Sequence, residues 1–249
     1  MPELSLAGRR DTQEASDVQL PRELVGVAPG HTIALALTAL DPAMRTFLGI
    51  DERLDSLCAI GARVAAAPQC FAADEAVKAT DTSFIRLEMP RDTEGDAGPG
   101  TFLLLGAQTA ADAVRACELT LAGVRDTTMG NVFTNPAGHV ECQFSARAGA
   151  VLAGAFGAPL GQAFAVMVGA PAPVGLIMAD AAAKAASIEV TQMLSPAYGI
   201  SYSNEVITFF TGATAAVHTA VLAGREAGLC ALGALEPSCA PKPAGTPTL

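Results

Sequence analysis

A repeated stretch constrains this chain more than any other feature of its sequence. Residues 71–84 read as a short alanine-rich helix followed by a strand, and a similar stretch returns at residues 177–190. At an offset of 106 residues, the positions that match are Ala73, Asp74, Ala76, Lys78 and Ala79, which fall on Ala179, Asp180, Ala182, Lys184 and Ala185. The chain therefore contains two copies of one structural unit.

The same offset also matches blocks of other kinds. It places Leu54 on Leu160, Ala59 on Ala165, Pro90 on Pro196 and Gly106 on Gly212. Upstream, Gly30-His31 falls on Gly138-His139 at an offset of 108. Because these positions belong to strands, helices and turns alike, we expect a largely gap-free duplication.

Each copy has roughly the order strand, helix, strand, helix, strand, loop, strand, helix. In the first copy the apolar patterns predict strands at 32–37, 57–61, 83–88 and 101–106, and helices at 42–47, 69–80 and 109–122. In the second they predict strands at 138–144, 162–168, 188–194 and 205–211, and helices at 147–156, 175–186 and 213–228. Four strands and three helices in such a short unit favour an α+β fold.

The units imply four segments. We expect a flexible N-terminal leader over residues 1–24, a first domain over 25–130, a second domain over 131–235 and a disordered tail over 236–249. With 51% hydrophobic and 16% charged residues, the 249-residue chain has too little charge to cover two separate small domains. Some apolar surface is therefore expected to enter an oligomeric interface.

Composition also argues against several classes of protein. The longest apolar run, residues 163–179, contains Gly169, Pro171, Pro173 and Gly175, so it does not read as a membrane span. The N-terminus is polar and lacks a secretory hydrophobic core, which indicates a cytosolic protein. The net charge of −10, without a basic cluster, argues against nucleic-acid binding.

No set of residues indicates catalysis, a cofactor or a metal. The six cysteines form no CxxC pair, lack histidines at ligand spacing and read as buried reduced thiols. His31 and His139 occupy duplicated positions, which favours a structural role for both, and His218 lies within a helix. Gly199 to Ser203 lacks the closing glycine of a nucleophile elbow. We predict a protein that is not an enzyme.

The repeated helix motif, Ala72-Ala73-Asp74-Glu75-Ala76-Val77-Lys78-Ala79, precedes a strand, a glycine-rich loop and a strand that ends at Gly106. It resembles the signature of bacterial microcompartment shell (BMC) domains. In both copies a strand and a helix precede the first signature strand, which is the circularly permuted, tandem arrangement. The resemblance covers roughly residues 23–236 and is strongest to members from propanediol-utilising compartments. Further matching segments are 87–93, 135–139, 155–161, 168–175 and 201–205.

This resemblance implies much of what the chain would do. It implies two tandem permuted BMC domains, each a four-stranded antiparallel sheet with flanking helices, and a homotrimer that forms a pseudohexameric disc. Such discs would tile edge to edge with other shell proteins in a microcompartment shell and could contact encapsulated enzymes. The implied role is structural, with pores for small polar metabolites such as diols, aldehydes or aminoalcohols.

The resemblance also implies site residues. By matching segment, pore-lining or metabolite-binding positions would be Thr101, Phe133, Asn135, Ser201, Tyr202 and Ser203, and the composition of the two loops adds Gly98, Gly100 and Tyr198. Their hydroxyl and amide groups suit neutral polyols, although loops that merely close the centre of the disc would explain the same residues. Lys78 and Lys184 would lie at the rim, where neighbouring discs meet, or be ordinary solvated helix positions.

A different function also fits the sequence. A soluble trimeric sensor could bind a small molecule in the cleft between the two domains. A shell protein should form sheets when overproduced, whereas a sensor should remain a discrete trimer. An enzyme would require a nucleophile or metal set, and a turnover lost on Ser201→Ala would point to one.

Overall fold

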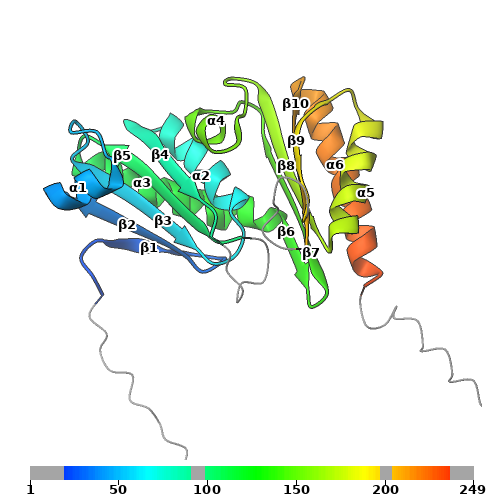
Figure 1. The fold of residues 1–249 in the computed structure, drawn as a ribbon, viewed down its shortest axis with the longest axis horizontal. Helices are drawn as coiled ribbons and strands as arrows, with labels where there is room; N and C mark the ends of the chain where they lie inside the picture. The colour runs from blue at the N-terminus through cyan, green and yellow to red at the C-terminus, as the bar shows by residue number, and fades with distance from the viewer. Residues whose placement is uncertain (1–19, 91–98, 197–203, 236–249) are drawn as a thin grey trace, which may run out of the picture.

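The computed structural model describes residues 20–90, 99–196 and 204–235, which form two similar halves side by side (Figure 1). The first half consists of β1 (Leu24–Ala28), β2 (Thr32–Thr38), α1 (Pro42–Leu48), β3 (Ser56–Ala62), α2 (Ala67–Lys78), β4 (Thr82–Glu88), β5 (Thr101–Ala107) and α3 (Ala110–Gly123). The second consists of β6 (Val132–Asn135), β7 (Gly138–Ser145), α4 (Ala150–Phe156), β8 (Ala163–Ala170), α5 (Ala172–Ala185), β9 (Glu189–Leu194), β10 (Val206–Gly212) and α6 (Thr214–Gly233). A π-helical turn, Val124–Thr128, and a 3-10 turn, Met129–Asn131, join the halves.

Each half is built on one antiparallel sheet. The strand orders are β1-β2-β3-β5-β4 and β6-β7-β8-β10-β9, so the two sheets have the same topology. This confirms the duplicated α+β fold. The expected number of four strands is wrong, because a fifth strand, β1 or β6, pairs with β2 or β7 at the edge of each sheet.

The two edge strands are short, which is why their patterns are weak. β1 has five residues and contains Gly26, and β6 has four residues and is followed by a turn. In that turn Asn135 Oδ1 accepts the backbone N–H groups of Ala137 and Gly138. A run this short carries too few alternations to be separated from a loop.

The duplication is real, but the single offset of 106 is wrong outside one segment. Phe84 in β4 pairs with Leu105, and Val190 in β9 pairs with Phe210. Each pair lies next to a β-bulge, so the two pairs occupy equivalent places in the two sheets. Those partners lie 105 residues apart, while Cys58 and Ala165, which pair with them in turn, lie 107 apart. One further strand out, the equivalent Ala36 and Phe144 lie 108 apart.

The matches of Ala59 to Ala165 and of Gly106 to Gly212 are therefore off by one residue. Connections of slightly different length cause the offset to drift from 108 in β2 and β7, through 106 in α2 and α5, to 105 in β5 and β10. Since side chains alternate along a strand, one residue of slip assigns a position to the wrong face of the sheet.

The prolines in the longest apolar run start a helix. Pro171 is the N-cap residue of α5 and Pro173 lies in its first turn, where the missing N–H group costs no hydrogen bond. α5 therefore begins at Ala172, a few residues earlier than the pattern predicts. Within the described residues, none of the helices has the length and apolar character needed to cross a membrane.

Helix α2 lies between the two sheets, whereas α5 and α6 cover the outer face of the second sheet (Figure 1). One apolar core joins α2 and α3 to the first sheet and continues into β8 and β10 of the second. A second core lies between the second sheet and α5 and α6. The leader up to residue 19 and the tail from residue 236 lie outside the described residues.

Candidate functional site

The first copy of the repeated motif joins the two halves of the chain. Asp74, on α2, is 1% exposed and accepts backbone hydrogen bonds from the start of α4 in the second half. Gly149 N lies 2.8 Å from Asp74 Oδ2, and the N atoms of Val151 and Leu152 each lie 3.1 Å from Asp74 Oδ1. The N-cap residue of α4, Gly149, has no side chain that could accept these hydrogen bonds, so the carboxylate of Asp74 caps the helix instead.

Lys78 completes this contact. Its ammonium donates to the carbonyl oxygen of Arg147 at 2.5 Å and lies 2.9 Å from Asp74 Oδ2 and 2.6 Å from Glu75 Oε1. Burial opposes the charged form, but the hydrogen bonds to Glu75 and Asp74 outweigh it and raise the pKa of Lys78. The side chain stays 29% exposed at the surface end of the contact. We call this contact between α2, β4 and α4 the internal seam.

Apolar side chains complete the internal seam. Phe71 of α2 stacks on Phe164 of β8, which stacks on Phe209 of β10, with ring centroids 6.4 and 6.3 Å apart. Phe84 of β4 lies against α4 at Gly154, where an added Cβ would come 2.4 Å from the ring. A glycine is therefore required opposite the large aromatic ring.

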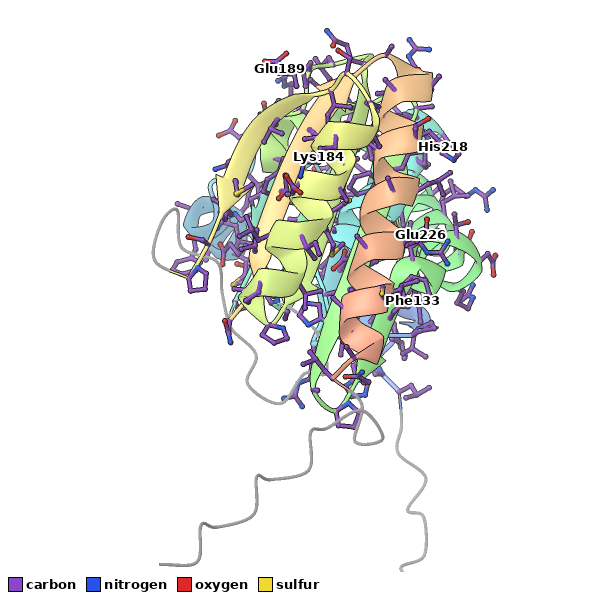
Figure 2. All side chains as sticks on the ribbon, turned by 90° about the vertical axis from the view of Figure 1, so that its right-hand side faces the viewer. Phe133, Lys184, Glu189, His218 and Glu226 are labelled. Atoms are coloured by element: carbon purple, nitrogen blue, oxygen red, sulfur yellow. The ribbon has the colours of Figure 1, made fainter. Side chains whose placement is uncertain are left out.

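Among the described residues, the second copy of the motif has no such partner. Asp180 Oδ2 and Lys184 Nζ lie 2.6 Å apart, and their side chains are 56% and 74% exposed. Figure 2 looks onto this face, with Lys184 labelled on α5. Large apolar side chains beside them are also open: Leu176, Ile177 and Val190 are 56%, 47% and 44% exposed. We call this surface of α5 and β9 the open face.

Helix α1 is the counterpart of α4. Unlike α4, it is exposed, as the open face is. Both helices have seven residues and end at a glycine in the left-handed conformation, Gly49 or Gly157. Met44 is 49% exposed, whereas Leu152, its equivalent in α4, is fully buried in the internal seam. α1 differs in having its own N-cap, because Asp41 Oδ1 accepts Ala43 N at 2.8 Å.

The expected pore residues that the structure describes fall in two places. Gly100 and Thr101 lie together at the start of β5: a Cβ on Gly100 would come 2.8 Å from Ala62 O, and Thr101 Oγ1 donates to Ala65 O at 2.9 Å. Phe133 and Asn135 lie in β6 against α6, where Arg225 sits 4.8 Å from the Phe133 ring and Asn135 donates to Leu232 O. The remaining predicted residues, Gly98, Tyr198, Ser201, Tyr202 and Ser203, lie outside the described residues.

A buried acidic cluster lies beside the internal seam, and the sequence analysis missed it. Glu141 of β7 and Glu205 before β10 are 2% and 0% exposed, and His139 Nε2 lies 3.3 Å from Glu205 Oε2. Burial, reinforced by the charge of Glu205 and partly offset by a hydrogen bond from Gln143, raises the pKa of Glu141 to about 8. An acid between Val140 and Cys142 in a buried strand is a signal that could have revealed it.

The described part of the first half contains no counterpart of this cluster. The strand pairing places Ile33 at the position of Glu141 and His31 at that of His139. His31 is exposed with a φ of 53°, whereas His139 is 4% exposed. The duplicated histidines therefore share a position but not an environment.

Comparisons with known proteins agree with this architecture. The sequence profile of the BMC domain matches residues 163–238. The bacterial microcompartment shell protein PduB of Citrobacter freundii is 45% identical over 226 residues, which cover 91% of this chain and 83% of that protein.

Two solved structures have the same fold. EtuB from Clostridium kluyveri has a TM-score of 0.83 and 43% identity, with 87% of this chain and 95% of EtuB covered. A trimeric shell protein PduB has a TM-score of 0.80 and 38% identity, with 85% and 93% covered.

Proposed function

The chain belongs to the BMC-domain family of bacterial microcompartment shell proteins, and from this premise we propose that three copies close into a disc that tiles the shell. Its role in the shell is structural. The observation that carries the trimer is the contrast between the two copies: the internal seam joins α2 and β4 to α4, whereas no described residue covers the exposed sides of the equivalent α5, β9 and α1. A related shell protein of the same fold is trimeric.

The open face and α1 fit one another by composition. In the internal seam Phe84 faces Gly154, and the equivalent positions are Val190 on β9 and Thr46 on α1. A large and a small side chain are thus replaced by two of middle size, which keeps the filled volume similar. In the ring, α5 and β9 of each copy contact α1 of the next.

Sedimentation of the purified chain over a range of concentrations tests this proposal. We expect a single species of three chains, and electron microscopy of concentrated protein should show flat sheets. A discrete trimer without sheets would favour the sensor. The disc would also contact other shell proteins at its rim and enclosed enzymes on one face, which pull-down with co-expressed shell proteins and enzymes tests.

The pore is the finer part of the proposal. We infer that small polar metabolites pass beside the internal seam, near Gly100, which lets backbone atoms come close, and near Thr101, whose buried hydroxyl group donates to Ala65 O and can still accept a hydrogen bond. Saturation-transfer NMR with 1,2-propanediol and ethanolamine should give signals that weaken in Thr101→Val. Thr219→Val, on the exposed side of α6, is the matched control. Equal signals in both variants would count against passage at this position.

A further inference from the structure

The seam between copies cannot repeat the charge contacts of the internal seam, because one glycine is replaced by an aspartate. Gly149, the N-cap of α4, corresponds to Asp41, the N-cap of α1, as the matching helix lengths and terminal glycines indicate. The backbone confirms the match: Leu40 N donates to Asp55 O, and Ala148 N donates to Gln162 O.

Space rules out the same arrangement. A Cβ on Gly149 would come 2.7 Å from Asp74 Oδ1 and 2.8 Å from Lys78 Cε. Asp41 has a whole side chain at this place, so Asp180 and Lys184 of a neighbouring copy cannot lie as Asp74 and Lys78 do. One of the three equivalent donors is also taken, because Ala43 N, the counterpart of Val151 N, already donates to Asp41 Oδ1.

A second substitution compensates for the first. In the internal seam the ammonium of Lys78 has two carboxylate partners on its own helix, Asp74 and Glu75. The residue equivalent to Glu75 on α5 is Ala181, so Lys184 has Asp180 and lacks the second acid. The missing acid is present across the expected seam, at Asp41. The number of charges in the contact is conserved, but one of them has moved to the other copy.

We propose that Lys184 forms an ion pair with Asp41 of the neighbouring copy, and that Asp180 does not cap α1. The inference rests on the proposed trimer. The seam between copies is then held at this point by a partly exposed, salt-sensitive ion pair, where the internal seam has a buried cap. Assembly and folding would thereby respond differently to ionic strength.

A double-mutant cycle tests this pair. We expect Lys184→Met to lower the association constant of the trimer about tenfold in low salt, from a factor of about two at each of three seams. In an Asp41→Asn background, which keeps the N-cap, the same substitution should have less than about half that effect. Glu226→Gln on the exposed side of α6, labelled in Figure 2, should change nothing.

A second set of variants tests whether Asp41 is what prevents Asp180 from capping α1. Asp41→Gly recreates the sequence of the internal seam, so Asp180 should then cap α1 and Asp180→Asn should weaken the trimer severalfold. With Asp41 present, Asp180→Asn should not weaken it.

The outcomes are distinguishable by sedimentation. Trimers in which Lys184→Met acts equally with and without Asp41 would overturn the ion pair and leave the proposed function standing. A chain that remains monomeric at all concentrations would overturn the trimer, and the ion pair with it.

Discussion

The two copies of the Asp-x-x-x-Lys helix motif have the same residues and different surroundings. On α2, Asp74 is buried against α4 and Lys78 reaches a carbonyl group of the second half. On α5, Asp180 and Lys184 pair with each other, are largely exposed and contact no other charged group within the described ranges. A motif that is satisfied in one copy and open in the other marks the place where a further copy is expected, because both were shaped by one kind of seam.

The sharpest way to test the difference is to remove both aspartates in turn. Asp74→Ala leaves three backbone N–H groups at the start of α4 without an acceptor and Lys78 without a buried partner. We expect it to lower the free energy of unfolding by about 3–5 kcal/mol. Asp180→Ala should cost less than about 1 kcal/mol. Urea denaturation at one protein concentration measures both, and equal losses would contradict the comparison.

The pH dependence of stability distinguishes the two seams, because the buried acid Glu141 lies beside the internal seam and its equivalent in the first half is Ile33. Burial and the charge of Glu205 raise the pKa of Glu141 from 4.5 to about 8, so the folded chain keeps a proton that the unfolded chain releases. The stability this gives is complete below about pH 4.5 and is lost as the pH rises to about 8.

Between about pH 5 and pH 8 the free energy of unfolding should fall by about 3–4 kcal/mol, at about 1.4 kcal/mol per pH unit. Urea denaturation at these pH values should show a flatter dependence for Glu141→Gln. If the wild-type chain and the variant respond equally, Glu141 is not the group that titrates.

Exchanging side chains between the seams tests their equivalence. Gly154→Thr copies Thr46 into α4 and brings a side chain against Phe84, so it should destabilise the chain by about 1–3 kcal/mol. Adding Phe84→Val copies Val190 and should restore most of the loss, as thermal unfolding can measure. Additive losses would show that the two positions do not form one contact.

The smallest effect on folding is expected at the two lysines. Lys78→Ala with Lys184→Ala should weaken the trimer no more than about tenfold, as expected for Lys184→Met, and concentrated protein should stay trimeric because apolar contacts dominate both seams. The same double variant should not form sheets. Electron microscopy of the double variant decides between the rim and an ordinary solvated position. Normal sheets would remove the lysines from the contact between discs.

Much of the fold could be predicted, because the two copies of the repeat must have the same order of strands and helices. The second copy of each strand and helix supported the first, so even short elements such as 57–61 were found. β1 and β6 were missed because four or five residues give little periodicity. The offset of 106 is correct for the helix motif, but isolated matches of alanine or glycine elsewhere could not reveal a slip of one residue in the strands.

The site was less predictable. The sequence identified Lys78 and Lys184 as equivalent. Spacing along the chain cannot show, however, that Lys78 contacts the start of α4 while Lys184 is exposed. Asp74 precedes Lys78 by one helical turn and was passed over, because its partners are backbone groups 75 to 78 residues away. Phe133 and Asn135 were grouped with the loops by resemblance, whereas they lie in β6 against α6.

The most direct test of the assembly is a cross-link between the copies. Thr46→Cys with Val190→Cys, in a chain with Cys230→Ser and Cys239→Ser, places thiols at the positions equivalent to Gly154 and Phe84. A short bis-maleimide should then give a covalent species of three chains on a denaturing gel. Val190→Cys with Thr219→Cys, whose second thiol lies on α6, should give far less. Monomers alone, or equal yields from both pairs, would contradict a ring in which α5 and β9 of one copy meet α1 of the next.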